Sequence, residues 1–136
     1  MSAIKKRKLF CELSPACYHI SLRKEYLLRD IHDRFSGEIF ARTRNTVPFS
    51  AVVKSHSSNA LRRLEGVDME LQRNKLVNLR LASAQINGLV VQPGETFSFW
   101  KLVGEPSAKR GYLDGLVISA GKIGRGVGGG LCQLAN

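Results

Sequence analysis

The sequence is poor in cysteine and has no long apolar run, and each shortage excludes a class of protein. Its three cysteines are too few, and odd in number, for the disulfide framework of a small secreted domain. No stretch approaches the roughly 18 consecutive apolar residues of a transmembrane helix. The basic run 5–8 leads straight into a short mixed segment, so no signal peptide is visible. We therefore expect reduced thiols and a location in the cytoplasm or peripheral to the membrane.

Basic charge is plentiful, but the usual signs of nucleic-acid recognition are missing. The net charge is +10, and it is uneven: residues 1–63 hold 13 Lys or Arg against 5 Asp or Glu, whereas residues 64–136 hold 8 against 6. The basic residues lack interleaved aromatics, and no helix-turn-helix or zinc-finger pattern is present. We expect no specific nucleic-acid partner. An anionic polymer, an anionic membrane face or a partner protein would suit the basic half, and a merely solvated basic face is the alternative.

Two segments have the apolar spacing of helices. Apolar residues spaced mostly by four predict a helix over 21–35 that ends near Gly37. A second helix is predicted from Asn74, as its N-cap, to the stop at residues 87–88. Its apolar face is expected to carry Val77, Leu81 and Ala84. The stretch 41–59 between the helices contains a proline and a polar cluster, and this composition indicates irregular chain.

Extended segments follow the second helix. Pro93 and Gly94 suit the two central positions of a tight turn, which predicts a hairpin between strands at 89–92 and 96–100. Residues 116–119 and 121–123 indicate further strands. The predicted fold class is α+β, with amphipathic helices packed on a small, mainly antiparallel sheet.

The most informative segment is Gly124–Asn136, which reads G-R-G-V-G-G-G-L-C-Q-L-A-N. It places Cys132 after Gly128, Gly129 and Gly130 at an expected helix start, where unpaired N–H groups and the helix dipole stabilise a thiolate. Such a thiolate is a nucleophile for an amide or ester carbonyl, with the backbone N–H of Cys132 or Gln133, or the Gln133 side chain, as the oxyanion donor. The alternative is a small buried cysteine, with the glycines needed only for tight loop geometry.

A nucleophilic cysteine commonly needs an imidazole as its base. His56, among serines in the irregular stretch, is the best placed of the three histidines, although a surface histidine in a turn is the commoner outcome. Trp100 is a candidate for stacking on a sugar or peptide, or else a packing residue. Cys11, Cys17 and His19 do not have a zinc spacing. We predict no metal and no cofactor.

Several motifs together resemble the VanW family. They are Asn74-Lys75 leading a helix to Ile86-Asn87-Gly88, P-G-E-T-F-S-F-W at 93–100, Gly111-Tyr112, Gly115-Leu116-Val117, and G-G-G-L-C-Q-L at 128–134. Members of this family are found beside glycopeptide-resistance genes, so the resemblance implies an association with vancomycin resistance or the cell envelope. Members also continue past the C-Q-L motif, which implies that this chain is a truncated, incomplete domain.

The resemblance and the residues together give a domain scheme and two functional hypotheses. Residues 1–66 are expected to form a basic, partly helical region, and residues 67–136 the amino-terminal part of a VanW-like core. In the first hypothesis Cys132 and His56 are catalytic and act on amide bonds of cell-wall peptides. Its substrate-binding residues are Gly128, Gly129, Gly130, Gln133 and Trp100. In the second, a non-catalytic module binds an anionic polymer or a partner protein through the basic half.

Overall fold

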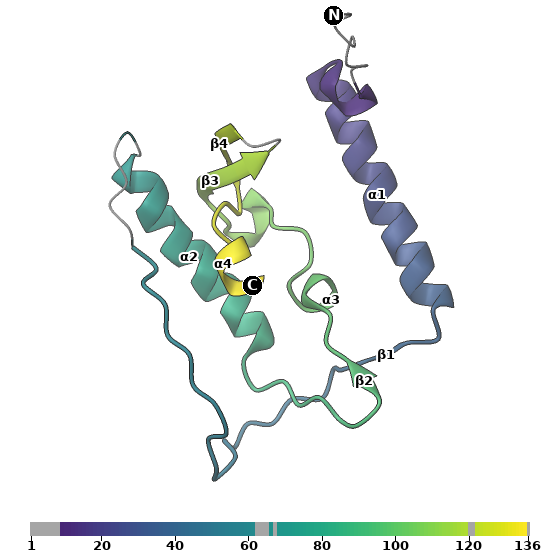
Figure 1. The fold of residues 1–136 in the computed structure, drawn as a ribbon, viewed down its shortest axis with the longest axis vertical. Helices are drawn as coiled ribbons and strands as arrows, with labels where there is room; N and C mark the ends of the chain where they lie inside the picture. The colour runs from purple at the N-terminus through teal and green to yellow at the C-terminus, as the bar shows by residue number, and fades with distance from the viewer. Residues whose placement is uncertain (1–8, 62–65, 67, 120–121, 136) are drawn as a thin grey trace, which may run out of the picture. The chain divides into compact units, whose positions relative to one another are not determined.

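The computed structural model of the chain describes residues 9–61, 66, 68–119 and 122–135. The basic run Lys5 to Lys8 and the predicted strand residue Gly121 lie outside these residues. The chain divides into two compact units, Met1–Ile39 and Phe40–Asn136. This division falls earlier than residue 66, and the boundary proposed from the sequence between residues 66 and 67 stays a prediction. Helices together with two short strand pairs confirm the α+β class (Figure 1).

The first unit consists mainly of one long helix. A 3-10 turn, η1 (Phe10–Glu12), precedes α1 (Pro15–Phe35). The helix begins six residues before the predicted start because Ser14 caps it, accepting a hydrogen bond from the Cys17 N–H at 3.2 Å, and because Pro15 fits the first helical position. It ends before Gly37, as predicted, and that glycine has a φ of 71°. None of the residues of α1 is buried.

The second unit is built on α2 (Met69–Ile86). The helix is confirmed, but its start is not at Asn74: Asp68 caps it by accepting a hydrogen bond from the Glu70 N–H at 2.8 Å. Of the predicted apolar face, Leu81 packs against the core, whereas Val77 and Ala84 are exposed, and the buried residues of α2 are Gln72, Asn78 and Ala82. Val77 is 37% exposed, whereas the polar Asn78 is 0% exposed.

The predicted hairpin at 89–100 is wrong, although its turn is present. The Glu95 N–H donates to the Gln92 oxygen at 3.0 Å, and Gly94 has the positive φ, 83°, that this turn requires. However, β2 (Glu95–Thr96) pairs with β1 (Ile39–Phe40), and the Ala41 N–H donates to the Thr96 oxygen at 3.0 Å. The segment before the turn instead contacts the irregular stretch, through a bridge between Leu89 and Arg44.

Helical structure replaces the second strand of that hairpin. Residues Phe99–Val103 form α3, because Ser98 caps it by accepting a hydrogen bond from the Lys101 N–H at 3.3 Å. Phe99 packs against the core cluster of Ala82, Val103 and Tyr112, while Phe97 remains 47% exposed. The remaining elements are η2 (Ala108–Arg110), β3 (Asp114–Ser119), β4 (Lys122–Val127) and α4 (Cys132–Ala135).

The predicted strand at 116–119 is confirmed as part of β3, which pairs antiparallel with β4. Figure 1 shows this hairpin and α4 along one side of α2. The arrangement places the glycines that follow β4 against α2 and leads the chain into α4. This corner of the second unit carries the candidate site.

Candidate functional site

The three glycines before Cys132 let three other segments approach the backbone closely. A Cβ on Gly129 would lie 2.2 Å from the Gly115 carbonyl carbon, so two backbones meet here without side chains between them. A Cβ on Gly128 would lie 2.5 Å from Pro106 Cβ, and one on Gly130 would lie 2.2 Å from Lys75 Cγ. Gly128 and Gly130 also have positive φ values, 76° and 92°. The glycines therefore fix the course of this turn.

Asn78 of α2 ties the same turn to the helix. Its Nδ2 donates to the Leu113 oxygen at 2.9 Å and to the Gly129 oxygen at 3.0 Å. Its Oδ1 accepts from the Leu113 N–H at 2.8 Å. A fully buried amide is favourable only when it is paired in this way. The glycine turn is thus positioned by a polar side chain in the interior.

Cys132 follows this turn as the first residue of α4, and it is exposed. The sequence-based expectation of a thiol at a helix start is therefore met in position. The Gln133 N–H donates to the Gly130 oxygen at 3.2 Å, and the Cys132 N–H has no partner among the described residues. Of the two backbone donors predicted for an oxyanion, the Cys132 N–H is the one left unengaged.

Cys132 lines a hollow of about 470 Å³ whose walls are mostly apolar. The hollow is lined by Gln72 and Lys75 of α2, by Leu116, Val117 and Ile118 of β3, by Ile123 of β4, and by residues 128–133. The predicted substrate-binding residues Gly128, Gly129, Gly130 and Gln133 are therefore brought together with Cys132. A volume of this size suits a small ligand or a short peptide segment.

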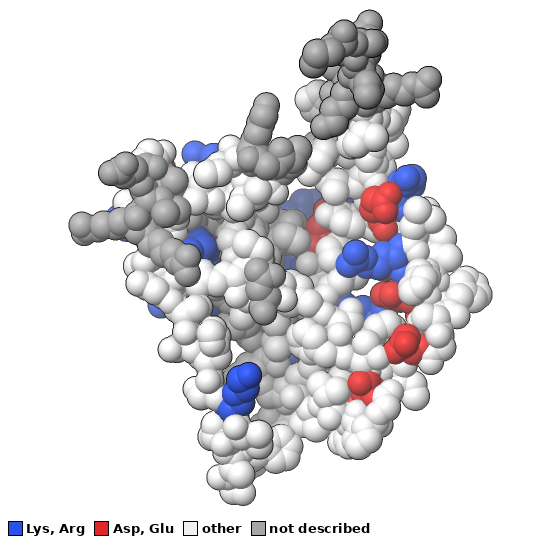
Figure 2. Space-filling view, viewed as in Figure 1, with Lys and Arg blue, Asp and Glu red and all other residues white. Residues whose placement is uncertain are grey.

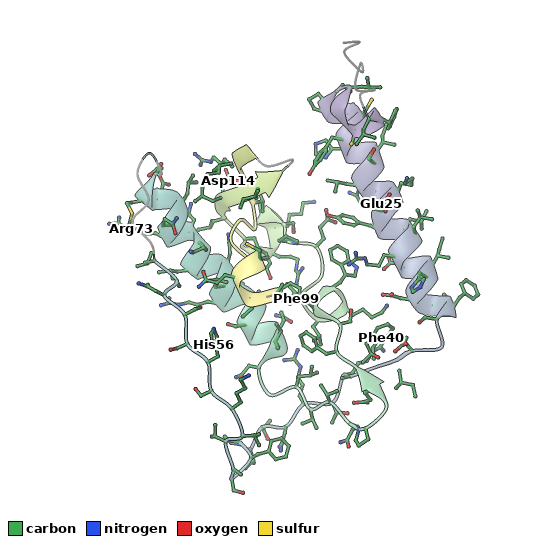
Figure 3. The ribbon with its side chains drawn as sticks, viewed as in Figure 1. Glu25, Phe40, His56, Arg73, Phe99 and Asp114 are labelled. Atoms are coloured by element: carbon green, nitrogen blue, oxygen red, sulfur yellow. The ribbon has the colours of Figure 1, made fainter. Side chains whose placement is uncertain are left out.

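His56 and Trp100 lie elsewhere, and neither lines the hollow. His56 is exposed on the irregular stretch, where Figure 3 labels it. That stretch nevertheless reaches α4, since Gln133 Nε2 donates to Ser58 Oγ at 2.9 Å and to the Asn59 oxygen at 3.3 Å. Trp100 is half-buried in α3. The catalytic role of His56 and the binding role of Trp100 stay predictions.

The lining residues that the sequence did not indicate are Leu131, the aliphatic residues of β3 and β4, and the two polar residues Gln72 and Lys75 of α2. For the polar pair a signal was present in the sequence. The available signal was their spacing with Asn78 and Ala82, which places all four along one face of a helix. The spacing of apolar residues alone does not indicate a face with this polar content.

The described residues contain neither a cluster of metal ligands nor a membrane-spanning helix. No group of three His, Cys, Asp or Glu side chains is arranged to hold a metal ion. No described helix is long and apolar enough to span a membrane.

Comparison with known proteins relates this chain to one family and to two individual proteins. Residues 74–136 match the family described as VanW like protein. The chain is 39% identical over 110 residues to vancomycin B-type resistance protein VanW of Enterococcus faecalis, an alignment that covers 76% of this chain and 38% of that protein. It is 41% identical over 59 residues to the uncharacterized protein YoaR of Bacillus subtilis, covering 43% of this chain and 20% of that protein. The chain thus spans less than two fifths of either relative. No solved structure matches it.

Proposed function

The chain is a VanW-like protein, and from this relation we propose that it acts in vancomycin resistance or at the cell envelope, as a cysteine-dependent enzyme on amide bonds of wall peptides. The observation that carries the proposal is an exposed cysteine that lines an apolar hollow and follows a closely packed glycine turn. An anchored nucleophile beside a concave surface is the usual arrangement of a covalent catalyst.

The proposed reaction starts with the Cys132 thiolate, which attacks the carbonyl carbon of a bound amide. The C–N bond breaks, the amine leaves with a proton, and a thioester remains on the sulfur. Water or a second amine then attacks the thioester and releases the thiol. The Cys132 N–H is the donor available for the oxyanion, and His56 is the proposed base.

The first test is the alkylation rate of each cysteine with iodoacetamide, followed by mass spectrometry across a pH series. We expect Cys132 to react at neutral pH at least about tenfold faster than the half-buried Cys11 and Cys17. Exposure alone also favours Cys132, so the pH profile is the decisive readout. A thiolate held by a base reacts well below the pH at which an ordinary thiol ionises, and replacing His56 with alanine should return the profile to the ordinary one.

Two results would contradict the proposal. One is a Cys132 rate that rises with pH as it does in an unfolded control, and the other is a profile that the His56→Ala change leaves unaltered. The first result removes the activated thiolate altogether. The second keeps the nucleophile and removes His56 as its base.

A second candidate function is a non-catalytic module that binds an anionic polymer or partner protein. The concentration of basic residues in 1–63 favours it. This function does not require a reactive Cys132, so the alkylation test separates it from the first.

A further inference from the structure

Helix α1 leaves much of its apolar surface exposed. None of its residues is buried, although a helix of a folded unit is normally stabilised by packing its apolar face against a core. Five large apolar side chains of this helix are each at least 45% exposed, namely Ile20, Leu27, Leu28, Ile31 and Phe35. A contiguous exposed apolar surface marks a place where another surface binds.

These five side chains share one side of the helix. Residues three, four or seven positions apart lie above one another on a helix. The steps from Ile20 to Leu27, then to Ile31 and then to Phe35 are seven, four and four residues. Leu28 lies at the edge of this side, seven residues before Phe35. We call the five side chains the α1 apolar face.

Cations lie within and beside the α1 apolar face. Lys24 lies within it, four residues after Ile20. Arg23 and Arg34 lie along one edge, four residues before Leu27 and seven residues after it. All three cations are exposed, and their long side chains can cover apolar surface while the charged end reaches outward.

The carboxylates of α1 lie on the other side of the helix. Glu25 follows Leu22 by three residues, and Asp30 and Asp33 follow Tyr26 by four and seven. Leu22 and Tyr26 are half-buried, which distinguishes this side from the α1 apolar face. Both signs of charge therefore occur around the whole helix, but the carboxylates are kept away from the exposed apolar side.

We propose that α1 binds an anionic lipid surface and lies in its plane. The α1 apolar face enters the boundary between headgroups and acyl chains, and Lys24, Arg23 and Arg34 contact the lipid phosphates. An apolar strip bordered by Lys and Arg is the composition of helices that lie in such an interface. The run K-K-R-K at residues 5–8, shortly before the helix in the sequence, adds charge of the sign that anionic lipids attract.

The charges favour a lipid surface over other occupants. Two copies of the α1 apolar face would bring like charges together, because cations border it and carboxylates do not. A soluble polyanion would use the cations and leave the aliphatic side chains exposed. No described helix, α1 included, is long and apolar enough to span a membrane, so the proposed contact is with the surface alone.

The test is co-sedimentation of the full chain with lipid vesicles. One set contains equal parts of phosphatidylglycerol and phosphatidylcholine, and the other contains phosphatidylcholine only. We expect at least about tenfold tighter binding to the anionic set, because several cations contact its surface. This binding should weaken as the salt concentration rises.

A double variant, Leu27→Gln with Ile31→Gln, removes two members of the α1 apolar face and keeps residues that favour a helix. It should bind the anionic vesicles at least about tenfold more weakly, because it has less apolar surface to bury. The matched control is Val52→Gln with Val53→Gln, which alters two aliphatic side chains that are 82% and 98% exposed outside α1. The control should bind as the unaltered chain does.

Four results would overturn the proposal. They are no binding to the anionic vesicles, equal binding to both sets, equal binding by the α1 variant and its control, and self-association without vesicle binding. The last result, measured by sedimentation velocity, would assign the face to a second copy. If circular dichroism shows that the α1 variant has lost helix, a Lys24→Gln, Arg34→Gln variant decides in its place, with Arg73→Gln, Arg80→Gln as its control.

This inference does not depend on the proposed enzyme. Vesicle binding does not use the reactivity of Cys132, and the alkylation rates do not use α1. The two proposals therefore fail on different measurements.

Discussion

At the scale of single residues, Asn78 has the largest structural role near the site. Three of its hydrogen bonds reach two segments, since Leu113 precedes β3 and Gly129 follows β4. Both ends of the hairpin are therefore held to α2 through one buried amide. The same side chain determines where the glycine turn lies, and thereby where Cys132 lies.

Replacing Asn78 with alanine should lower the free energy of unfolding by about 3 kcal/mol, because it leaves the Leu113 N–H and the Gly129 oxygen without their partner, while the Leu113 oxygen still accepts from the Gly128 N–H at 2.9 Å. Asn74→Ala is the matched control. It removes one half-buried bond, to the Asp114 oxygen, and should cost about 1 kcal/mol. Urea denaturation measures both values. Equal losses would show that Asn78 does not hold the turn.

At the scale of secondary-structure elements, the sequence was sufficient to predict an element where nearby residues determine it. The turn at Pro93-Gly94, the body of α2 and the strand at 116–119 each follow from nearby residues, and the structure confirms them. The placement of Cys132 at a helix start was predictable for the same reason. The glycines before it could not continue a helix easily, and the residues after it could.

Predictions from the sequence were wrong where the residue that determines the structure lies far away in the sequence. The strand partner of Thr96 is the segment at residue 40, more than fifty residues earlier, so the hairpin prediction chose the nearer partner and was wrong. Ser98 carried a local capping signal, but the strand predicted at 96–100 left no place for a helix there. The buried face of α2 could not be identified from hydropathy, because Asn78 is buried to pair with backbone groups that only the fold brings near.

Gly129 and Gly94 show two different reasons why a position needs glycine. Another backbone approaches Gly129 closely, whereas Gly94 has a positive φ. Gly129→Ala would force a Cβ to 2.2–2.6 Å from the backbone of Gly115, which belongs to β3, a strand that contacts α2 and pairs with β4. Gly94→Ala meets nothing within 4 Å and suffers only from its φ of 83°. We expect a loss of at least about 3 kcal/mol for Gly129→Ala and about 1 kcal/mol for Gly94→Ala. Thermal and urea denaturation test this order, and equal effects would contradict the close approach.

At the scale of the whole molecule, the excess of Lys and Arg in residues 1–63 comes partly from residues that the structure describes and partly from residues that it does not. Lys5, Lys6, Arg7, Lys8, Arg62 and Arg63 lie outside the described residues. Along α1, Figure 2 shows basic and acidic side chains beside one another, and Lys24 pairs with Glu25 at 3.1 Å. The surface of α1 is therefore mixed in charge, and any attraction to an anionic polymer must come from the sum over residues 1–63.

Charge reversal distinguishes binding by the first half from a general effect of net charge. A variant with Arg23, Lys24 and Arg34 changed to glutamate alters the net charge by the same amount as one with Arg73, Arg80 and Lys109 changed, and all six side chains are exposed. If the first half binds a polyanion, only the first variant should elute from an anionic matrix at clearly lower salt, because its charges lie close to the bound polymer. Equal shifts for the two variants would indicate attraction to the molecule's total charge, and would remove the binding module as a function of this half of the chain.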